Sequence, residues 1–167
     1  MTHSPDQQAL LEHYVKKILA APVYDIAVRT PLQPAPALSQ ALGNRVLLKR
    51  EDLQPTFSFK IRGAYNKLVQ LSDEQRARGV ITASAGNHAL GLSYHGQDLG
   101  IPVTVVMPKW APLIKVKNCR NFGANIVLQG ETFDEARGHA MKLAESEKKT
   151  YVPGFDDPDI IAGTGTI

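Results

Sequence analysis

The sequence predicts an α/β protein in which a parallel sheet is covered by helices on both faces. Short apolar runs recur along residues 79–152, and helix-like stretches separate each run from the next. Glycines follow several of these stretches, and a glycine in the left-handed conformation commonly ends a helix. Strands that alternate with helices in this way form βαβ units, whose parallel strands are buried on both faces.

The composition is typical of a globular chain and excludes several classes of protein. Of the 167 residues, 43% are apolar and 21% are charged, which is too apolar for a disordered chain and sufficient for a buried core. The single cysteine, Cys119, excludes a disulfide framework and a cysteine-rich zinc module. The net charge of +3 comes from scattered basic residues, and no apolar run approaches the ~18 residues that span a bilayer. We therefore expect neither a nucleic-acid nor a membrane partner.

The N-terminal residues predict a helix. Ser4 is a suitable N-cap, Pro5 suits the first helical position, and apolar residues follow at helical spacing until Pro22. The segment has neither the basic and apolar regions of a secretory signal nor the arginine content of a transit peptide. With one unpaired cysteine, this indicates the cytoplasm or, alternatively, a mature organellar form.

Residues 30–71 are expected to contain two helices and one strand. An extended connector at 30–32 precedes a short helix near 35–42, which stops at Gly43. A strand is expected at 45–50, and a helix capped by Ser58 should continue to about Leu71.

Residues 79–152 contain the alternating pattern itself. The expected strands are 79–83, 102–107, 125–128 and 150–152, and the expected helices are 87–99, 113–122 and 132–147. Residues 156–167 indicate the start of another helix that nothing caps. Such an ending is expected of a chain cut from something longer, and the alternative is a frayed terminus.

The first candidate for chemistry is Lys60, in the first turn of the helix that follows Ser58. A helix N-terminus lowers the proton affinity of a nearby amine, which helps an amine that must attack a carbonyl group. The alternative is a solvated surface lysine, which is the usual state of this residue type.

The second candidate is the segment 82–89, TASAGNHA, between an expected strand and an expected helix. Small residues let the backbone approach a ligand, and free N–H groups at a helix start bind anions. Ser84 and Asn87 add donors at the carboxyl edge of the strand, where open α/β sheets bind ligands. The alternative is a tight turn in which Ser84 or Asn87 caps the helix.

Other candidate motifs predict no chemistry. Neither nucleotide-binding glycine motif occurs. His88 and His95 share one helix face but have no cysteine or glutamate at ligand spacing, so no metal site is expected. Cys119 is interpreted as a packing or surface residue and not as a nucleophile.

Four motifs occur together in one order along the chain. They are RTPL at 29–32, KREDLQP at 49–55, SFKIRGA at 58–64 and TASAGNHA at 82–89. On these motifs the chain, from about Val15 to Ile167, resembles the threonine dehydratases (threonine ammonia-lyases) of biosynthetic type. These belong to the tryptophan-synthase-β-like, fold-type II family of pyridoxal-phosphate enzymes. Serine racemases and serine dehydratases share much of the same pattern.

The resemblance implies pyridoxal 5′-phosphate as the cofactor and assigns roles to particular residues. Lys60 matches the lysine that carries the cofactor and acts on the substrate, Phe59 matches the residue against the cofactor ring, and Asn87 matches the donor to the ring oxygen. The residues that match the loop holding the substrate carboxylate are Ser84, Ala85, Gly86, Asn87 and His88.

The resemblance also implies an activity and a domain organisation. The activity is the α,β-elimination of L-threonine to 2-oxobutanoate and ammonia, the first step of isoleucine biosynthesis, by a homo-oligomer of the full-length form. The alternatives are a serine racemase or serine dehydratase with serine as substrate, a non-catalytic truncated paralogue that binds a partner, and an unrelated doubly wound domain that binds an amino acid or anion. Residues 1–70 would belong to the large cofactor domain, 71–153 to the small domain, and 154–167 to the return to the large domain. The family's phosphate-binding glycine loop comes after the point where this chain ends, so we expect an N-terminal fragment that is inactive alone.

Overall fold

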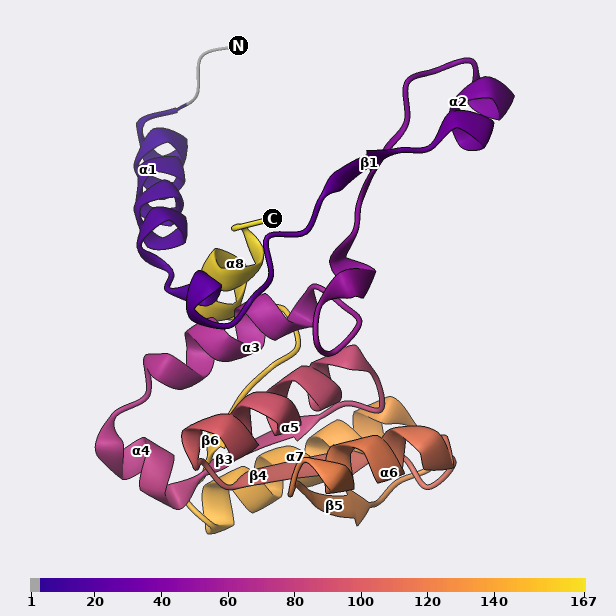
Figure 1. Cartoon of the computed structure of the whole chain (residues 1–167). Helices are drawn as coiled ribbons and strands as arrows, with labels where there is room; N and C mark the ends of the chain where they lie inside the picture. Colours follow the sequence, from indigo (N-terminus) through magenta and orange to yellow (C-terminus); the bar gives the residue numbers. More distant parts are fainter. Residues whose placement is uncertain (1–3) are drawn as a thin grey trace.

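The computed structural model describes residues 4–167 and has the expected α/β architecture (Figure 1). Residues 1–3, the start of the expected domain 1–70, lie outside the described residues. Within the described part, four parallel strands form one sheet in the order β5-β4-β3-β6. Their bounds are β3 Val80–Ala83, β4 Val103–Met107, β5 Asn125–Leu128 and β6 Thr150–Tyr151. Every one of these bounds agrees with the sequence prediction to within one residue.

Helices cover both faces of this sheet (Figure 1). The helices that follow its strands are α5 Asn87–Leu99, α6 Leu113–Asn121 and α7 Phe133–Ser146. On one face, α5 and α6 share a core with Val80, Val103 and Val105. On the other face, the alanines of α7 pack against Ile81 and Val106. Neighbouring strand residues are thus buried on opposite faces, which is the alternation that a sheet covered on both faces requires.

The remaining helices precede or follow the segment that contains the parallel sheet. They are α1 Pro5–Ala20, α2 Pro36–Leu42, α3 Lys60–Val69, α4 Asp73–Arg78 and α8 Pro158–Thr164, with short 3₁₀ turns η1 Val23–Asp25 and η2 Glu51–Leu53. Ser4 caps α1 as predicted, and Gly43 ends α2 in the left-handed conformation with φ 59°. No helix in residues 4–167 combines the length and the apolar character needed to cross a membrane.

The expected extended connector at 30–32 and strand at 45–50 differ from the structure in their extent and pairing. The chain at 30–32 continues into a strand, β1 Leu32–Pro34, which pairs antiparallel with β2 Leu47–Lys49. The two strands and α2 form an arm that projects away from the parallel sheet (Figure 1). The sequence shows a strand-like run, but its partner is set by tertiary structure and not by local pattern.

The expected helix from Ser58 to Leu71 also differs from the structure. It begins at Lys60, and the Ser58 hydroxyl accepts a hydrogen bond from the Lys60 N–H (3.3 Å) without serving as the N-cap. It ends at Val69, and α4 begins after Ser72, whose side chain and that of Gln75 form a capping box. This signal was present in the sequence but not included in the prediction.

The C-terminal helix α8 is capped, contrary to expectation. The Asp157 carboxylate accepts hydrogen bonds from the N–H groups of Asp159 and Ile160. α8 crosses α3 closely because glycines face each other at the crossing. A Cβ atom at Gly163 would lie 2.6 Å from the Arg62 carbonyl oxygen, so no larger residue fits there without backbone movement.

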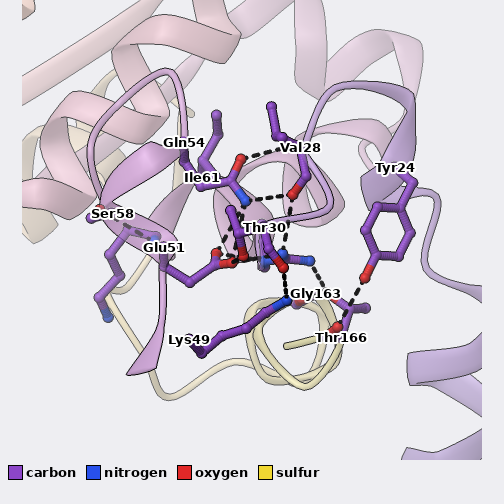
Figure 2. Close-up of polar contacts among 12 residues, drawn as sticks. Tyr24, Val28, Thr30, Lys49, Glu51, Gln54, Ser58, Ile61, Gly163 and Thr166 are labelled. Carbon is purple, nitrogen blue, oxygen red and sulfur yellow. Dashed lines mark hydrogen bonds and ion pairs between the residues drawn. The ribbon is translucent and has the colours of Figure 1, made fainter. Parts of the chain in front are cut away.

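A buried ion pair joins Arg62 of α3 to Glu51 of η2, and Figure 2 shows Glu51 among its hydrogen-bond partners. Arg62 is 0% exposed, and its Nε and Nη2 donate to the two carboxylate oxygens of Glu51, each at 2.8 Å. Thr30 donates its hydroxyl to the same carboxylate (2.5 Å), and the Gln54 amide donates to it at 3.2 Å. Arg62 Nη1 donates to Thr166 Oγ1 (3.1 Å). The Arg62–Glu51 pair and its hydrogen bonds thus connect four parts of the chain, which are Thr30, the turn 51–54, α3 and Thr166.

The ionisation of Glu51 is determined by these contacts. Burial disfavours its carboxylate, but hydrogen bonds from Arg62 and Thr30 outweigh burial and hold the pKa of Glu51 below its usual value. The carboxylate is therefore charged at neutral pH and neutralises the buried guanidinium.

We predict that Glu51→Gln lowers the free energy of unfolding by about 3–5 kcal/mol, because it leaves a buried arginine without its counter-charge. The pKa of Glu51 is lower in the folded state than its ordinary value of 4.5. The stabilisation is therefore complete above pH 4.5 and is lost as the pH falls through the lower, folded pKa. Urea unfolding at several pH values measures both effects. Asp52→Asn, which removes the neighbouring exposed pair with Arg50, is the control and should change stability little.

Candidate active site

A cavity of about 790 Å³ opens at the carboxyl end of β3. Its lining comes from the first turn of α3, the start of α5, one side of α7 and the segment after β6. The lining residues are Phe59, Lys60, Ala83, Ser84, Asn87, His88, Phe133, Arg137, Met141, Tyr151, Pro153, Gly154, Phe155 and Asp156. This edge of a parallel sheet is where α/β folds bind ligands.

Lys60 is the first residue of α3, and its amine is held by the backbone. Nζ donates to the carbonyl oxygen of Gly154 at 2.5 Å and lies 5.3 Å from the centre of the Phe59 ring. Burial lowers the pKa of Lys60 below its usual value. A lowered proton affinity was expected from the helix N-terminus, whereas its cause in the structure is burial. In either case, the amine is easier to obtain in its nucleophilic, neutral form.

The loop between β3 and α5 orders the start of that helix and presents Asn87 at the cavity. The Ser84 hydroxyl accepts hydrogen bonds from the N–H groups of Gly86 (3.2 Å) and Ala89 (3.3 Å). The N-cap residue of α5 is Gly86, so neither Ser84 nor Asn87 is the N-cap that the alternative interpretation expected, but the Ser84 hydroxyl satisfies two N–H groups at the start of the helix. Asn87 is exposed at the cavity as the first residue of α5, and the N–H groups of a first helical turn have no partner within the helix.

Most of the residues singled out in the sequence meet at this cavity. Phe59, Lys60, Ser84, Asn87 and His88 all line it. Ala85 and Gly86 are half-buried and are not among the lining residues, and the Gly86 N–H already bonds to Ser84.

Two parts of the lining were not anticipated from the sequence. α7 contributes Phe133, Arg137 and Met141, which are spaced four residues apart and so share one face of that helix. The segment 153–156 after β6 contributes the Gly154 carbonyl that accepts from Lys60. The available signal was topological, because the carboxyl ends of the parallel strands β3 and β6 lie at the same sheet edge.

Two histidines of α5 are buried and neutral. His88 Nε2 lies 3.2 Å from the Val152 carbonyl oxygen, and His95 Nε2 lies 2.9 Å from that of Ile61. Burial lowers the pKa of each imidazole to about 4, outweighing the hydrogen bond to the carbonyl. The side chain of His88 thus contacts a neighbouring backbone segment, whereas the resemblance assigned this residue to the carboxylate loop.

Cys119 has the packing role that was one of its two predicted readings. It is 1% exposed within the core shared by α5 and α6, and burial raises the pKa of its thiol. A buried thiol with a raised pKa carries little thiolate, so it is a poor nucleophile.

Comparisons with known proteins identify the family. Residues 23–167 match the family described as pyridoxal-phosphate dependent enzyme, and the chain belongs to that family. It is 54% identical over 154 residues to the chloroplastic biosynthetic threonine dehydratase 1 of Solanum lycopersicum, covering 92% of this chain and 25% of that relative. It is 49% identical over 154 residues to the biosynthetic L-threonine dehydratase IlvA of Escherichia coli, covering 92% of this chain and 30% of that relative. The chain thus spans about a quarter to a third of these relatives' length.

Solved structures agree with this assignment. The processed form of threonine deaminase isoform 2 from Solanum lycopersicum is similar over 100% of this chain and 45% of that one, with a TM-score of 0.90 and 48% identity. A serine racemase from Dictyostelium discoideum is similar over 90% of this chain and 50% of that one, with a TM-score of 0.82 and 31% identity. The fold is therefore that of the fold-type II pyridoxal-phosphate enzymes.

The residues at the cavity fit a cofactor of this type. Pyridoxal 5′-phosphate carries an aldehyde that combines with a lysine amine, and Lys60 presents an amine of lowered pKa in the cavity. Phe59 offers an aromatic face, and Asn87 offers an amide donor.

We predict that the free energy of unfolding falls as the pH drops from 6.5 to about 4, in addition to any effect of carboxyl groups. In this range the unfolded histidines take up protons that the folded His88 and His95 do not, so folding loses up to about 1.4 kcal/mol per pH unit for each histidine. Chemical unfolding at intervals across this range measures the slope. The double variant His88→Gln and His95→Gln should flatten it, and an unchanged slope would show that these two rings do not stay neutral.

Proposed function

We propose that this chain carries the lysine-bearing part of the active site of a biosynthetic threonine dehydratase. The reaction would be the α,β-elimination of L-threonine to 2-oxobutanoate and ammonia. The observation that carries the proposal is the Lys60 amine, which is half-buried at the cavity, has a lowered pKa and is bonded to the Gly154 carbonyl. The identity is 48% to the solved threonine deaminase from Solanum lycopersicum and 31% to the Dictyostelium serine racemase, which favours threonine over serine chemistry.

The proposed chemistry divides between the cofactor and this chain. When bound, pyridoxal 5′-phosphate would supply an electron-withdrawing ring that stabilises negative charge at the substrate α-carbon. Lys60 would hold the cofactor and, once its amine is released, would take the α-proton at Nζ. A lowered pKa helps this step, because an amine that is neutral at working pH can accept a proton. Phe59 would lie against the ring, and Asn87 would donate to the ring oxygen.

The start of α5 would hold the substrate carboxylate. Ser84 already satisfies the N–H groups of Gly86 and Ala89, so the carboxylate would be left with those of Asn87 and His88, at the first two positions of the helix. An anion at a helix N-terminus is stabilised by roughly 0.3–2 kcal/mol from the helix dipole. Fixing the carboxylate there would orient the α-carbon toward the Lys60 amine, and orientation of this kind supplies a large part of catalysis.

The expected domain division, assembly and compartment are also proposals. The division at about residues 70 and 153 is supported by the location of β3 to β6 and α5 to α7 between these limits. The homo-oligomer rests on the resemblance. The cytoplasm is expected from the single cysteine, whereas the relatives' names include chloroplastic and mitochondrial forms.

Lys60 should be the lysine that pyridoxal 5′-phosphate labels preferentially. We would incubate the chain with the cofactor near neutral pH, trap the product with borohydride, and quantify labelled peptides by mass spectrometry. Lys109 is the internal reference, since its ion pair with Glu131 raises its pKa while burial lowers that of Lys60. Labelling of Lys109 at the same or a higher level than Lys60 would contradict the assignment.

A chimera tests the activity itself. Replacing the matched segment of the Escherichia coli relative with this chain should give an enzyme that releases 2-oxobutanoate from L-threonine. Lys60→Ala in the chimera should abolish turnover, whereas Lys109→Ala should leave it unchanged. We expect the 167 residues alone to show no turnover, since they span about a quarter of the relatives' length. A folded chimera that stays inactive with both threonine and serine would refute the proposed function.

A further inference from the structure

The two buried histidines of α5 contact different parts of the chain through the same ring atom. His88 is 5% exposed and His95 is 0% exposed, and each places Nε2 within hydrogen-bond distance of a backbone carbonyl oxygen. A carbonyl oxygen can only accept, so in both rings Nε2 must carry the proton and donate it. Each Nδ1 is then unprotonated, and neither has a hydrogen-bond partner among the described residues. Both rings therefore act as neutral, single donors.

The two carbonyl groups that accept from the histidines lie close in sequence to Gly154 and Lys60, the two residues joined by the Lys60 hydrogen bond. His88 donates to Val152, two residues before Gly154, whose carbonyl accepts from the Lys60 amine. Gly154 also lies against the His88 ring, because a Cβ atom on it would be 3.7 Å from His88 Cγ. His95 donates to Ile61, the residue that follows Lys60 in the first turn of α3.

We propose that His88 and His95 are positioning residues for the Lys60 amine. His88 fixes the segment that supplies the accepting carbonyl, and His95 fixes the helical turn that supplies the donating lysine. Both are on α5, a single rigid helix, so the distance between the two fixed segments is set by the seven-residue spacing of the histidines. The importance of this arrangement for catalysis rests on the proposed function, whereas the positioning itself does not.

Neither histidine is suited to direct proton transfer. Each ring is buried, each protonated nitrogen is engaged with a backbone oxygen, and His95 packs against the rings of Tyr65 and Tyr94. A residue that was needed only to fill this space would not require a donor. The donor at the same ring atom in both histidines indicates that the hydrogen bonds, and not the ring volume alone, are used.

The test observes the Lys60 ammonium directly. In the ¹⁵N-labelled chain at pH about 6, where lysines are charged and these histidines are not, the ammonium held by Gly154 should give a sharp ¹H–¹⁵N signal. His88→Leu and His95→Leu keep side-chain bulk but lose the donor, and each should abolish the Lys60 signal through faster exchange with water. His88→Gln and His95→Gln keep a side-chain donor, so each should retain the Lys60 signal that the leucine variants lose.

Two controls separate positioning from general destabilisation. Ser93→Ala alters a buried residue of α5 whose hydroxyl bonds within the helix, to the Ala89 carbonyl at 2.8 Å, and it should leave the Lys60 signal intact. The Lys67 ammonium, which is paired with Asp157 and Asp159, should give an unchanged signal in every variant. Persistence of the Lys60 signal in either folded leucine variant would overturn the proposal, as would its loss in Ser93→Ala.

A measurement on the unmodified chain keeps the proposal falsifiable if the leucine variants do not fold. The ¹⁵N chemical shifts of both rings should identify the tautomer with a proton on Nε2 at pH about 6, and a proton on Nδ1 in either ring would overturn the proposal.

Borohydride trapping distinguishes this inference from the proposed function. Preferential cofactor label on Lys60 with an unchanged ammonium signal in the leucine variants would reject the positioning role alone. Absence of label with the expected signals would reject the function alone.

Discussion

The first turn of α3 is fixed by the ion pair between Arg62 and Glu51, and much of the remaining structure is arranged around it. A guanidinium cannot lose its proton in a protein, so a buried arginine must be given a counter-charge and further acceptors. Glu51 supplies the charge, Thr166 accepts a further hydrogen bond from Arg62, and Thr30 and Gln54 donate to the Glu51 carboxylate (Figure 2). The turn that carries Lys60 is thereby anchored to the segments before it and after it.

Lys60 and Arg62 show how two nearby cations acquire different roles from their surroundings. Arg62 is compensated by a carboxylate, so its charge is stable and its role is structural. Lys60 meets a carbonyl, and burial lowers its pKa. A dipole repays less of the desolvation cost of an ammonium than a full opposite charge does. The same helical turn thus holds one permanently charged anchor and one amine that can become neutral.

The elements that the sequence predicted well are those specified by local signals. The helix at 87–99 ends as expected, because Gly100 adopts the left-handed conformation, with φ 67°, that terminates it. The pairing of β1 with β2 was not predicted, because the partner of a strand is set by contacts distant in sequence. For the same reason, Lys60 and Asn87 could be identified from their motifs, whereas the Gly154 carbonyl and the α7 face depend on how distant segments meet.

Three consecutive residues of α3 are each fixed by a different element. The Lys60 amine is bonded to the segment after β6, the Ile61 carbonyl to α5, and the Arg62 side chain to η2. Any one of these contacts could be lost to thermal motion, but together they leave the turn few alternative arrangements. Ordering a reactive amine before its reaction partner arrives places the entropic cost in folding rather than in catalysis. The same logic explains why buried polar groups, which seldom add net stability, are concentrated beside this cavity: they restrict position where an apolar core would permit several packings.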